Sequence, residues 1–390
     1  MSLGQLSFDN EGITAAFSYA QQAEEVAQDL AGQLIGSSLG FVLFFCSAEY
    51  DLTALSTALE RHFVGVPLIG CTTAGEITAR GYGRGCISAI GFDHKYFSVA
   101  SVLIDEMECF SLYDAQNLVE NLVSDCRSNA LAPIKDHSFA LTLLDGLSSR
   151  EEVVLAALSA ALGSIPHFGG SAGDDNHLTH TYVYYDGQFH TSAAVVVLIN
   201  THLAFEVFTT HHLQPSEEKL VVTKVDSDSR RVLEFNAEPA AKEYARLINC
   251  RLDALNMHMF ASYPLAVKIS ESYYPRAIQQ ANSDQSLTFY CAVENGIVLT
   301  AMNTSSLLDN VNQLFLGLNQ RLGELLVTIG CDCFLRRLEI DIKGGQASIE
   351  EVLQKQHVIG FNTYGEQFNG MHINQTFTGV AIGRPKHDSY

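Results

Sequence analysis

The same stretch of sequence occurs twice in this chain, first from Phe41 and again from Phe139. Each copy contains an apolar run, a polar loop, an amphipathic stretch, a short apolar run that follows a proline, and then a hydroxyl residue, Ala, Gly and an acid. The first copy ends in Thr73–Glu76 and the second in Ser171–Asp174; these two segments are called tips below. Such a repeat predicts two structurally equivalent units with an unusual backbone at each tip.

The pattern of elements predicts a mixed α/β fold, because each unit reads as strand, helix, strand, strand, strand. We expect one helix over the first ~35 residues, within an N-terminal helical extension at 1–37. A duplicated domain is predicted at 38–235, with repeats at about 38–110 and 136–215. A smaller α/β domain is predicted at 236–390, where Asn236 can cap a helix. In this second domain we expect a long helix over about 306–328 and strands near 334–340 and 357–361.

The composition excludes several classes of partner. The formal net charge of −21 over 390 residues disfavours nucleic acids and anionic membranes, which are themselves polyanions. No apolar run approaches the ~20 residues that span a bilayer, and no secretory signal is recognisable. We therefore expect a cytoplasmic protein whose nine cysteines are reduced. The oligomeric state, including a homodimer, stays open.

Three segments resemble a known family. The runs Ile69–Glu76 and Phe168–Asp175 look like the hallmarks of the FIST N domain, and His357–Glu366 with the following Asn374–Thr376 resembles the end of the FIST C domain. The resemblance covers the chain from about 38 to 383. It implies a bacterial intracellular sensory module for small ligands that is coupled to signal-transduction proteins.

A narrower resemblance concerns a subgroup of stand-alone two-domain FIST proteins. This subgroup includes haem proteins that sense nitric oxide and act on histidine kinases or cyclic-di-GMP enzymes. The chain is similar to it in size, in the expected lack of a fused output domain, and in the segment Thr209–Thr223. The resemblance implies haem as cofactor, nitric oxide as ligand and one of those signalling enzymes as partner.

The glycines of the tips suggest a ligand cradle, because a glycine-rich turn exposes backbone N–H groups and allows close approach. Such a cradle suits a carboxylate, a phosphate or a haem propionate. The alternative is that the glycines only permit tight turns and the acids cap the following segments. The loop after the first strand of the second unit can converge on the same crevice. The candidate ligand-binding residues are Cys71, Thr73, Gly75, Glu76, Asp145, Gly146, Gly170, Ser171, Gly173 and Asp174.

His211 and His212 are the candidate haem ligands, since they follow an aromatic strand and stand opposite Leu103 and Ile104 when the two units are aligned. A haem pocket needs a neutral nitrogen ligand and apolar walls. We prefer His212, because strand alternation places it on the face of Phe208. The alternative is a hydrogen-bonded structural histidine. The remaining candidates are His167, His202 and His258.

Other chemistries have weaker signals. Cys331 and Cys333 could bind zinc or act as a redox pair, but no second ligand pair accompanies them, so buried thiols are the simpler interpretation. Standard enzyme motifs are absent, and Cys71 and Ser171 are candidate nucleophiles without an associated histidine. We expect a sensor rather than an enzyme. The leading hypothesis is haem-based nitric oxide sensing with His212 as ligand. The alternative is a haem-free receptor for an amino acid or other small anion at the tips.

Overall fold

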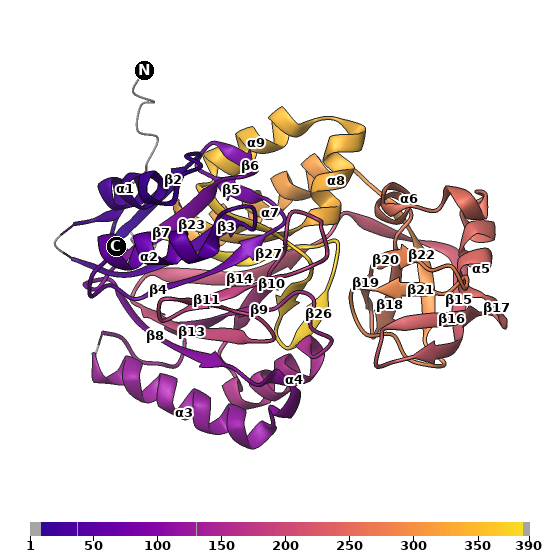
Figure 1. The fold of residues 1–390 in the computed structure, drawn as a ribbon, viewed down its shortest axis with the longest axis horizontal. Helices are drawn as coiled ribbons and strands as arrows, with labels where there is room; N and C mark the ends of the chain where they lie inside the picture. The colour runs from indigo at the N-terminus through magenta and orange to yellow at the C-terminus, as the bar shows by residue number, and fades with distance from the viewer. Residues whose placement is uncertain (1–8, 37, 130, 385–390) are drawn as a thin grey trace.

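The computed structural model describes residues 9–36, 38–129 and 131–384, which form two parts (Figure 1). The body comprises residues up to 212 and from 305 onward, and the lobe comprises residues 213–304. The mixed α/β class is confirmed. Among the described helices, none combines the length and the apolar composition that crossing a bilayer requires.

The body contains three units of the same design rather than the two that the sequence repeat predicts. Each unit runs strand, helix, strand, helix, strand, hairpin, strand. The first unit consists of β2 (Ile13–Ser18), α1 (Ala23–Leu34), β3 (Leu39–Ser47), α2 (Leu52–His62), β4 (Leu68–Thr73), β5 (Glu76–Thr78), β6 (Gly81–Gly83) and β7 (Ile87–Asp93), after a short β1 (Asp9–Asn10). The second consists of β8 (Phe97–Ile104), α3 (Leu112–Ser128), β9 (Ser138–Leu144), α4 (Glu151–Leu162), β10 (His167–Ser171), β11 (Val183–Tyr185), β12 (Gln188–His190) and β13 (Ala194–Thr201).

The third unit is divided in the sequence by the lobe. It consists of β14 (Ala204–Thr210), α7 (Leu307–Leu322), β23 (Leu325–Cys333), α8 (Phe334–Lys343), α9 (Gln346–Lys355), β24 (Val358–Thr363), β25 (Glu366–Phe368), β26 (Met371–Ile373) and β27 (Phe377–Gly383). Its tip is Thr363–Glu366, so the segment that resembles the end of the FIST C domain is also a third copy of the repeat.

The three units exchange their hairpins in a ring. The parallel pairs β3–β4, β9–β10 and β23–β24 form the centres of three sheets. Each hairpin then extends the sheet of a neighbouring unit: β5 pairs with β24, β25 pairs with β10, and β11 pairs with β4. The body is therefore closed by cyclic exchange, with approximate threefold symmetry.

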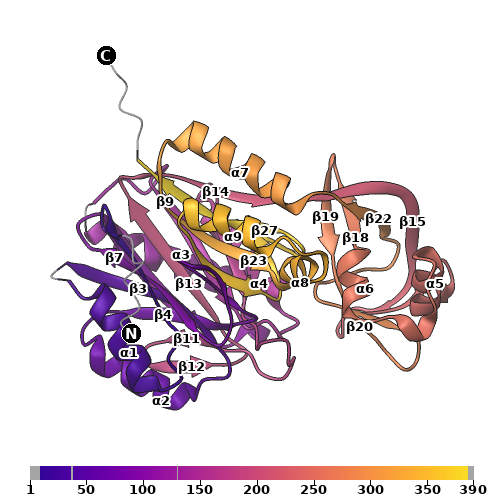
Figure 2. The ribbon, with the colours of Figure 1, turned by 90° about the horizontal axis from the view of Figure 1, so that it is seen from above.

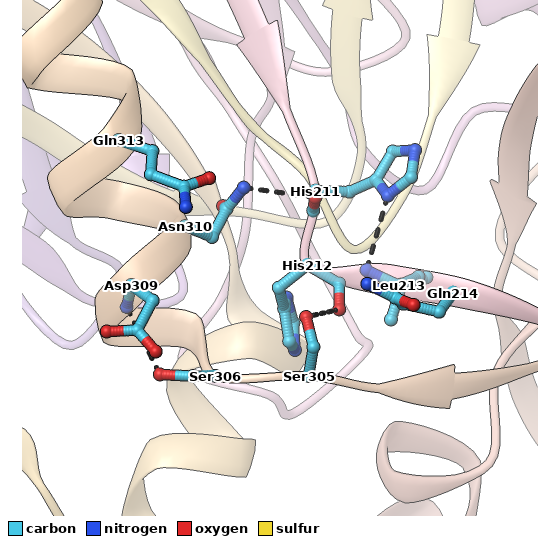
Figure 3. A pocket seen from close by; sticks show the side chains of 9 residues that line it. All are labelled: His211, His212, Leu213, Gln214, Ser305, Ser306, Asp309, Asn310 and Gln313. Atoms are coloured by element: carbon cyan, nitrogen blue, oxygen red, sulfur yellow. Dashed lines mark hydrogen bonds between the residues drawn. The ribbon is translucent and has the colours of Figure 1, made fainter.

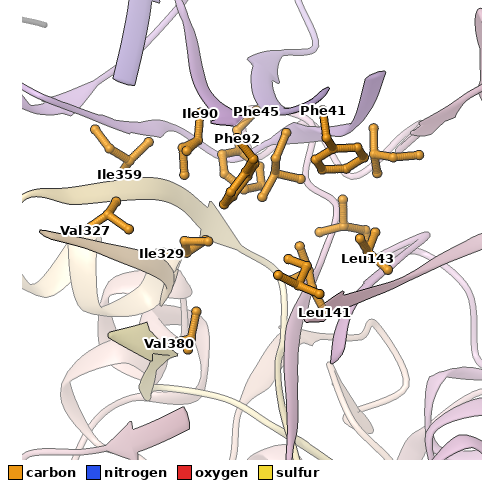
Figure 4. Packing of buried hydrophobic residues seen from close by; sticks show 14 of the residues in the cluster. Phe41, Phe45, Ile90, Phe92, Leu141, Leu143, Val327, Ile329, Ile359 and Val380 are labelled. Atoms are coloured by element: carbon orange, nitrogen blue, oxygen red, sulfur yellow. The ribbon is translucent and has the colours of Figure 1, made fainter. Parts of the chain in front are cut away.

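The inner faces of the three sheets enclose one apolar core (Figure 4). Phe45 of the first unit stacks on Phe361 of the third, with ring centroids 4.6 Å apart. Helices cover the outer faces in pairs: α1 and α2 on the first sheet, α3 and α4 on the second, and α7 and α9 on the third. Polar side chains cap the N-termini of α2, α3 and α7; Ser111, for example, forms a reciprocal capping box with Asp114 at the start of α3.

The lobe is a twisted antiparallel sheet with short helices, inserted between β14 and α7 (Figure 2). Its elements are β15 (Leu213–Asp226), β16 (Arg231–Phe235), β17 (Glu238–Pro239), α5 (Ala240–Leu247), α6 (Met257–Ser262), β18 (Leu265–Ile269), β19 (Ser272–Arg276), β20 (Ile278–Ala281), β21 (Leu287–Phe289) and β22 (Val298–Thr304). The domain boundary predicted at 235/236 falls between β16 and β17, inside this sheet.

Three local predictions differ from the structure. The N-terminal region contains strand β2 before helix α1, and β2 pairs with β7 along its whole length. The predicted strand at 334–340 is helix α8, whose Arg336 bonds to Asp332 near the end of β23 and to His212, and whose Glu339 also bonds to His212. The predicted long helix at 306–328 ends at Leu322, beyond which Gly323 has a positive φ and β23 begins.

Candidate functional site

The three tips meet and hydrogen-bond to one another at one end of the body. The bonds run from Ala74 N to Asn362 O (2.9 Å), from Gly173 N to Thr72 O (3.0 Å) and from Ser171 N to Gly365 O (2.8 Å). Each tip therefore contacts both of the others. Gly173 permits the contact, since a Cβ there would lie 2.5 Å from Ala74 N.

The N–H groups that could have formed an anion cradle already have partners within the protein. Gly75 N donates to Thr73 Oγ1 (3.2 Å), and Gly365 N donates to Thr363 Oγ1 (2.8 Å). Together with the bonds between tips, this arrangement uses the backbone donors to close the turns. The geometry thus favours the alternative in which the glycines serve tight turns.

The hydrogen-bond register corrects the alignment of the second tip. Asn362 N donates to Gly75 O and Ser171 N donates to Gly365 O, whereas the equivalent Thr72 N donates to Tyr182 O. Tyr182 therefore occupies the position of the tip glycines, and Val183 that of Glu76 and Glu366. The second unit carries a loop at 173–182 instead of an immediate hairpin, so Asp174 is not the equivalent of Glu76.

Glu76 is a fully buried carboxyl at the start of β5. It accepts hydrogen bonds from Thr73 Oγ1 (2.5 Å) and Cys86 N (3.4 Å). Burial outweighs these bonds and raises its pKa to about 7. Glu366 is buried in the same position of the third unit, accepts from Thr376 N (3.0 Å), and has a pKa raised well above its usual range by burial.

Asp174 has the opposite electrostatic behaviour. Its carboxylate accepts hydrogen bonds from the backbone N–H groups of Leu178 (2.9 Å), Thr179 (2.6 Å) and His180 (3.0 Å), and from the Tyr364 hydroxyl. Burial alone would raise the pKa of Asp174, but these donors lower it below its usual value. Asp174 therefore holds the 173–182 loop in shape as an anion.

Asp145 is a further buried acid of the second unit. It follows β9 and accepts from Ser192 N (2.5 Å), Leu147 N (3.0 Å) and the Thr181 hydroxyl. Gly146 packs directly on the carbonyl of Ala172, where a Cβ would collide. The structure thus brings Asp145 and Gly146 beside the second tip.

The remaining tip candidates lie in the interior. Cys71 is fully buried in the core, and burial raises its thiol pKa well above the usual range, which disfavours a thiolate nucleophile. Gly170 faces the ring of Phe361 in the same core. Ser171 Oγ is buried without a hydrogen-bond partner among the described residues, so no base contacts it. Cys331 and Cys333 are likewise buried thiols with raised pKa values.

His212 lies where the chain passes from body to lobe, and both of its ring nitrogens are engaged. Nδ1 lies 3.1 Å from Arg336 Nη1, and Nε2 lies 2.8 Å from Glu339 Oε2. Burial lowers the pKa of His212, and the Arg336 guanidinium also lowers it, although Glu339 opposes both. When the units are aligned by strand register, Thr210 and not a histidine corresponds to Ile104: Ile104 of β8 pairs with Ala194, and Thr210 of β14 pairs with Phe377.

His211 points away from His212 and lines a pocket of about 270 Å³ (Figure 3). Its Nδ1 accepts from Leu213 N (3.3 Å). The other residues of this pocket are mostly polar: Gln214, Ser305, Ser306, Asp309, Asn310 and Gln313. The apolar walls that a porphyrin requires are missing, and His212 has no free nitrogen, so these residues do not fit haem. His167 is a buried structural histidine bonded to Ile165 O (3.1 Å).

A buried ion cluster joins the lobe to the body, and none of its residues was singled out from the sequence. Arg230 of the lobe donates from Nη2 to Glu151 Oε2 (2.7 Å) and Glu152 Oε2 (2.5 Å) at the start of α4. His372 Nδ1 of the third unit lies 3.2 Å from Glu152 Oε1. No periodicity in a single sequence connects Arg230 with acids so far away along the chain.

Arg230 also donates from Nη1 to the Tyr290 carbonyl (2.7 Å). Burial would raise the pKa of Glu152, but His372 and Arg230 lower it below its usual range. Burial raises the pKa of the deeper Glu151 in spite of Arg230. The guanidinium is therefore balanced by carboxyl groups of the body.

A pocket of about 360 Å³ lies beside this cluster, at the junction of the body and the lobe. Its body side is formed by residues 146–149 of the loop between β9 and α4, and by Leu178 of the 173–182 loop that the second unit alone carries among the described units. Its lobe side is formed by Asp228, Ser229, Arg230, Gln279, Gln280, Thr288, Phe289 and Tyr290.

Comparisons with known proteins agree with the family resemblance. The FIST N domain model matches residues 40–238, and the FIST C domain model matches residues 240–369. An uncharacterised protein of Methanocaldococcus jannaschii, MJ1623, is 22% identical, with 92% of this chain and 76% of that protein covered.

Likeness to solved structures is low. Cyanuric acid hydrolase from A. caulinodans gives a TM-score of 0.38 at 7% identity, over 95% of this chain and 99% of that one. PurL from T. maritima gives 0.21 at 9% identity, over 97% and 74%. The two domain models together span most of the sequence, and on that ground the chain belongs to the FIST family, whose domains are generally small-ligand sensors of signalling proteins.

Proposed function

We propose that this protein is a small-ligand sensor whose signalling state is set by the docking of the lobe on the body. The observation that carries the proposal is the insertion of Arg230 between Glu151 and Glu152. Partial separation of a buried ion cluster leaves a charge without its partner in a low-dielectric site, which costs free energy. The cluster therefore favours two discrete states of the lobe, docked and undocked, over intermediate ones. A ligand that prefers one arrangement would shift the balance between them.

The docked lobe covers the ring of tips. Ala261, Ala277 and Tyr290 of the lobe form one apolar cluster with residues of the body, which are Ala74, Cys333, Phe334, Leu335 and Tyr364. Gln375 Nε2 donates to Ala261 O (3.0 Å) across this contact. Anything that binds at the tips would have to displace the lobe, so an amino acid or small anion held there has less support from the geometry.

The connection between the parts consists of two adjacent crossings. Ser305, on the returning segment, donates through its backbone N (2.8 Å) and its hydroxyl (2.6 Å) to His212 O on the outgoing one. The His212 ring is fastened to α8 by Arg336 and Glu339, and Lys343 of the same helix donates to Thr304 Oγ1 (2.7 Å). This favours a hinge role for His212 over a metal-ligand role.

Haem-based nitric oxide sensing, with a histidine kinase or a cyclic-di-GMP enzyme as partner, is the competing proposal. Its support is the resemblance alone. Protein that is supplied with haem and then freed of unbound haem should retain no Soret band under the docking proposal. A Soret band that shifts with nitric oxide and is lost in His212→Ala would establish haem sensing instead.

The docking proposal can be tested by energy transfer between the two parts. Cys109 of the body is exposed, Cys250 of the lobe is half-buried, and the other cysteines are buried, so fluorophores can be placed on this natural pair. We expect Arg230→Ala to change the transfer efficiency, and the matched control Arg231→Ala, which removes an exposed pair with Asp284, to leave it unchanged. Equal efficiencies in wild type and Arg230→Ala would exclude docking as the switched state.

A further inference from the structure

The pocket at the junction of the body and the lobe has the chemistry of a binding site. Of the residues that line it, Arg230 and Tyr290 each keep a polar atom, Nε and the hydroxyl, that is buried without a hydrogen-bond partner in the described part of the chain. Buried polar atoms of this kind are normally completed by water or a ligand. The volume of about 360 Å³ suits a small molecule.

The side chains of the pocket are mainly neutral hydrogen-bonding groups. They are the hydroxyls of Ser148, Ser149, Ser229 and Thr288 and the amides of Gln279 and Gln280. Each of these groups can both donate and accept. The groups that already bond within the chain can still form further hydrogen bonds. Gln280, for example, uses one of its two Nε2 hydrogens for Asn282 Oδ1 (3.2 Å).

The charges of the pocket do not favour an anion. Arg230 is the cation of its wall, and that charge is already balanced by Glu151 and Glu152. Asp228 contributes an exposed carboxylate to the same rim. The net charge of −21 adds a repulsive field for anions. Leu147 and Leu178 supply a small apolar surface opposite the amides.

We infer that the junction pocket binds a neutral, multiply hydrogen-bonding small molecule of the polyol or sugar class. This inference rests on the proposed sensor function and assigns its ligand site. The ligand would contact residues of both parts at once, Ser149 on the body and Gln280 on the lobe. It would therefore stabilise the docked arrangement, in which alone the pocket exists.

The test measures thermal stabilisation by a panel of compounds at millimolar concentration. The panel contains neutral polyols and monosaccharides (glycerol, myo-inositol, glucose), an amino acid (glutamate) and two anions (phosphate, citrate). We expect at least one neutral compound to raise the melting temperature, and Gln280→Ala to weaken its binding about tenfold, the effect of roughly one lost hydrogen bond. Gln188→Ala is the matched control, because Gln188 lines a groove of similar size in the first sheet.

Two outcomes would overturn the inference. Stabilisation by phosphate, citrate or glutamate that depends on Gln280, without any by the neutral compounds, would show that the ligand class is wrong while leaving the sensor proposal intact. Absence of every Gln280-dependent effect across the panel would remove the pocket assignment. The sensor proposal fails separately, through the energy-transfer measurement on Arg230→Ala.

Discussion

The first and second units share a sequence motif but use it differently. In the first unit the tip passes at once into the hairpin β5–β6, and its acid, Glu76, is a buried carboxyl with a raised pKa. In the second unit the hairpin is delayed by the 173–182 loop, and its acid, Asp174, is an anion held by backbone donors. The repeated motif therefore closes the body, and the copy that departs from it adds a loop whose Leu178 lines the junction with the lobe.

The loops of the second unit also line the junction pocket. The 173–182 loop provides Leu178, and the loop after β9 provides residues 146–149, to the junction pocket. The helix that follows, α4, provides the carboxyl groups that receive Arg230. The lobe thus docks on the second unit through this ion cluster, while its apolar cluster and its hydrogen bonds at Ala261 and Ala277 lie mainly against the third unit.

The largest effect is expected from removing the ion cluster that Glu151 and Glu152 of the second unit form with Arg230 of the lobe. Arg230→Ala leaves Glu151 and Glu152 beside each other without their cation, and we expect it to lower the free energy of unfolding by about 3–5 kcal/mol. Arg231→Ala should cost less than about 1 kcal/mol, because its pair with Asp284 is exposed. Urea unfolding measures both. Similar losses in the two variants would contradict a special role for the second unit.

An intermediate effect is expected at the first tip. There the free energy of unfolding should fall as the pH rises, which is the reverse of the usual pH dependence for a carboxyl group. Because the pKa of Glu76 is raised from 4.5 to about 7, the folded protein holds this proton more tightly than the unfolded chain. Its stabilising contribution is complete below pH ~4.5 and is lost as the pH rises through about 7, a total of about 3 kcal/mol. Glu76→Gln should abolish this loss, as shown by unfolding free energies from pH 4 to 8.

A smaller effect of opposite sign is expected at the second tip. Since the pKa of Asp174 is lowered, its contribution is present above the unfolded value of 3.8 and is lost as the pH falls through the lower folded value. Asp174→Asn should cost about 1–2 kcal/mol at pH 7, because the amide N–H group meets backbone donors, and less at pH 2. If Asp174→Asn and Glu76→Gln gave parallel pH profiles, the two tips would be equivalent after all.

Much of the body could be predicted from the sequence, because its strands are apolar runs separated by recognisable turn segments. The repeat predicted two units and the mixed α/β class. The third copy was missed because the lobe interrupts its unit and because Tyr364 replaces the alanine of the other tips. The N-terminal strand was missed because β2 contains two alanines, a threonine and a serine among its six residues, so its pattern did not separate it from the helix that follows.

The candidate site was harder to predict from the sequence than the fold of the body. The sequence showed that the tips are special, but not that their N–H groups bond to one another, since those partners are about a hundred or more residues apart in the chain. It showed that the second copy has histidines, yet His212 pairs with α8, a segment that was predicted to be a strand. Arg230 and Glu151 carry no local signal at all; only the folded chain brings them together.

The cyclic exchange of hairpins has a consequence for the folding of this protein during its synthesis. Ile77 of the first unit pairs with Gly360 of the third. At about 5–20 residues per second, a ribosome needs about 15–60 s to travel between these two positions. During that time Tyr82, which is buried in the finished protein, has no neighbouring sheet to cover it. The first unit to be synthesised is thus among the last to be completed, and the nascent chain carries an open strand edge that chaperones would have reason to shield.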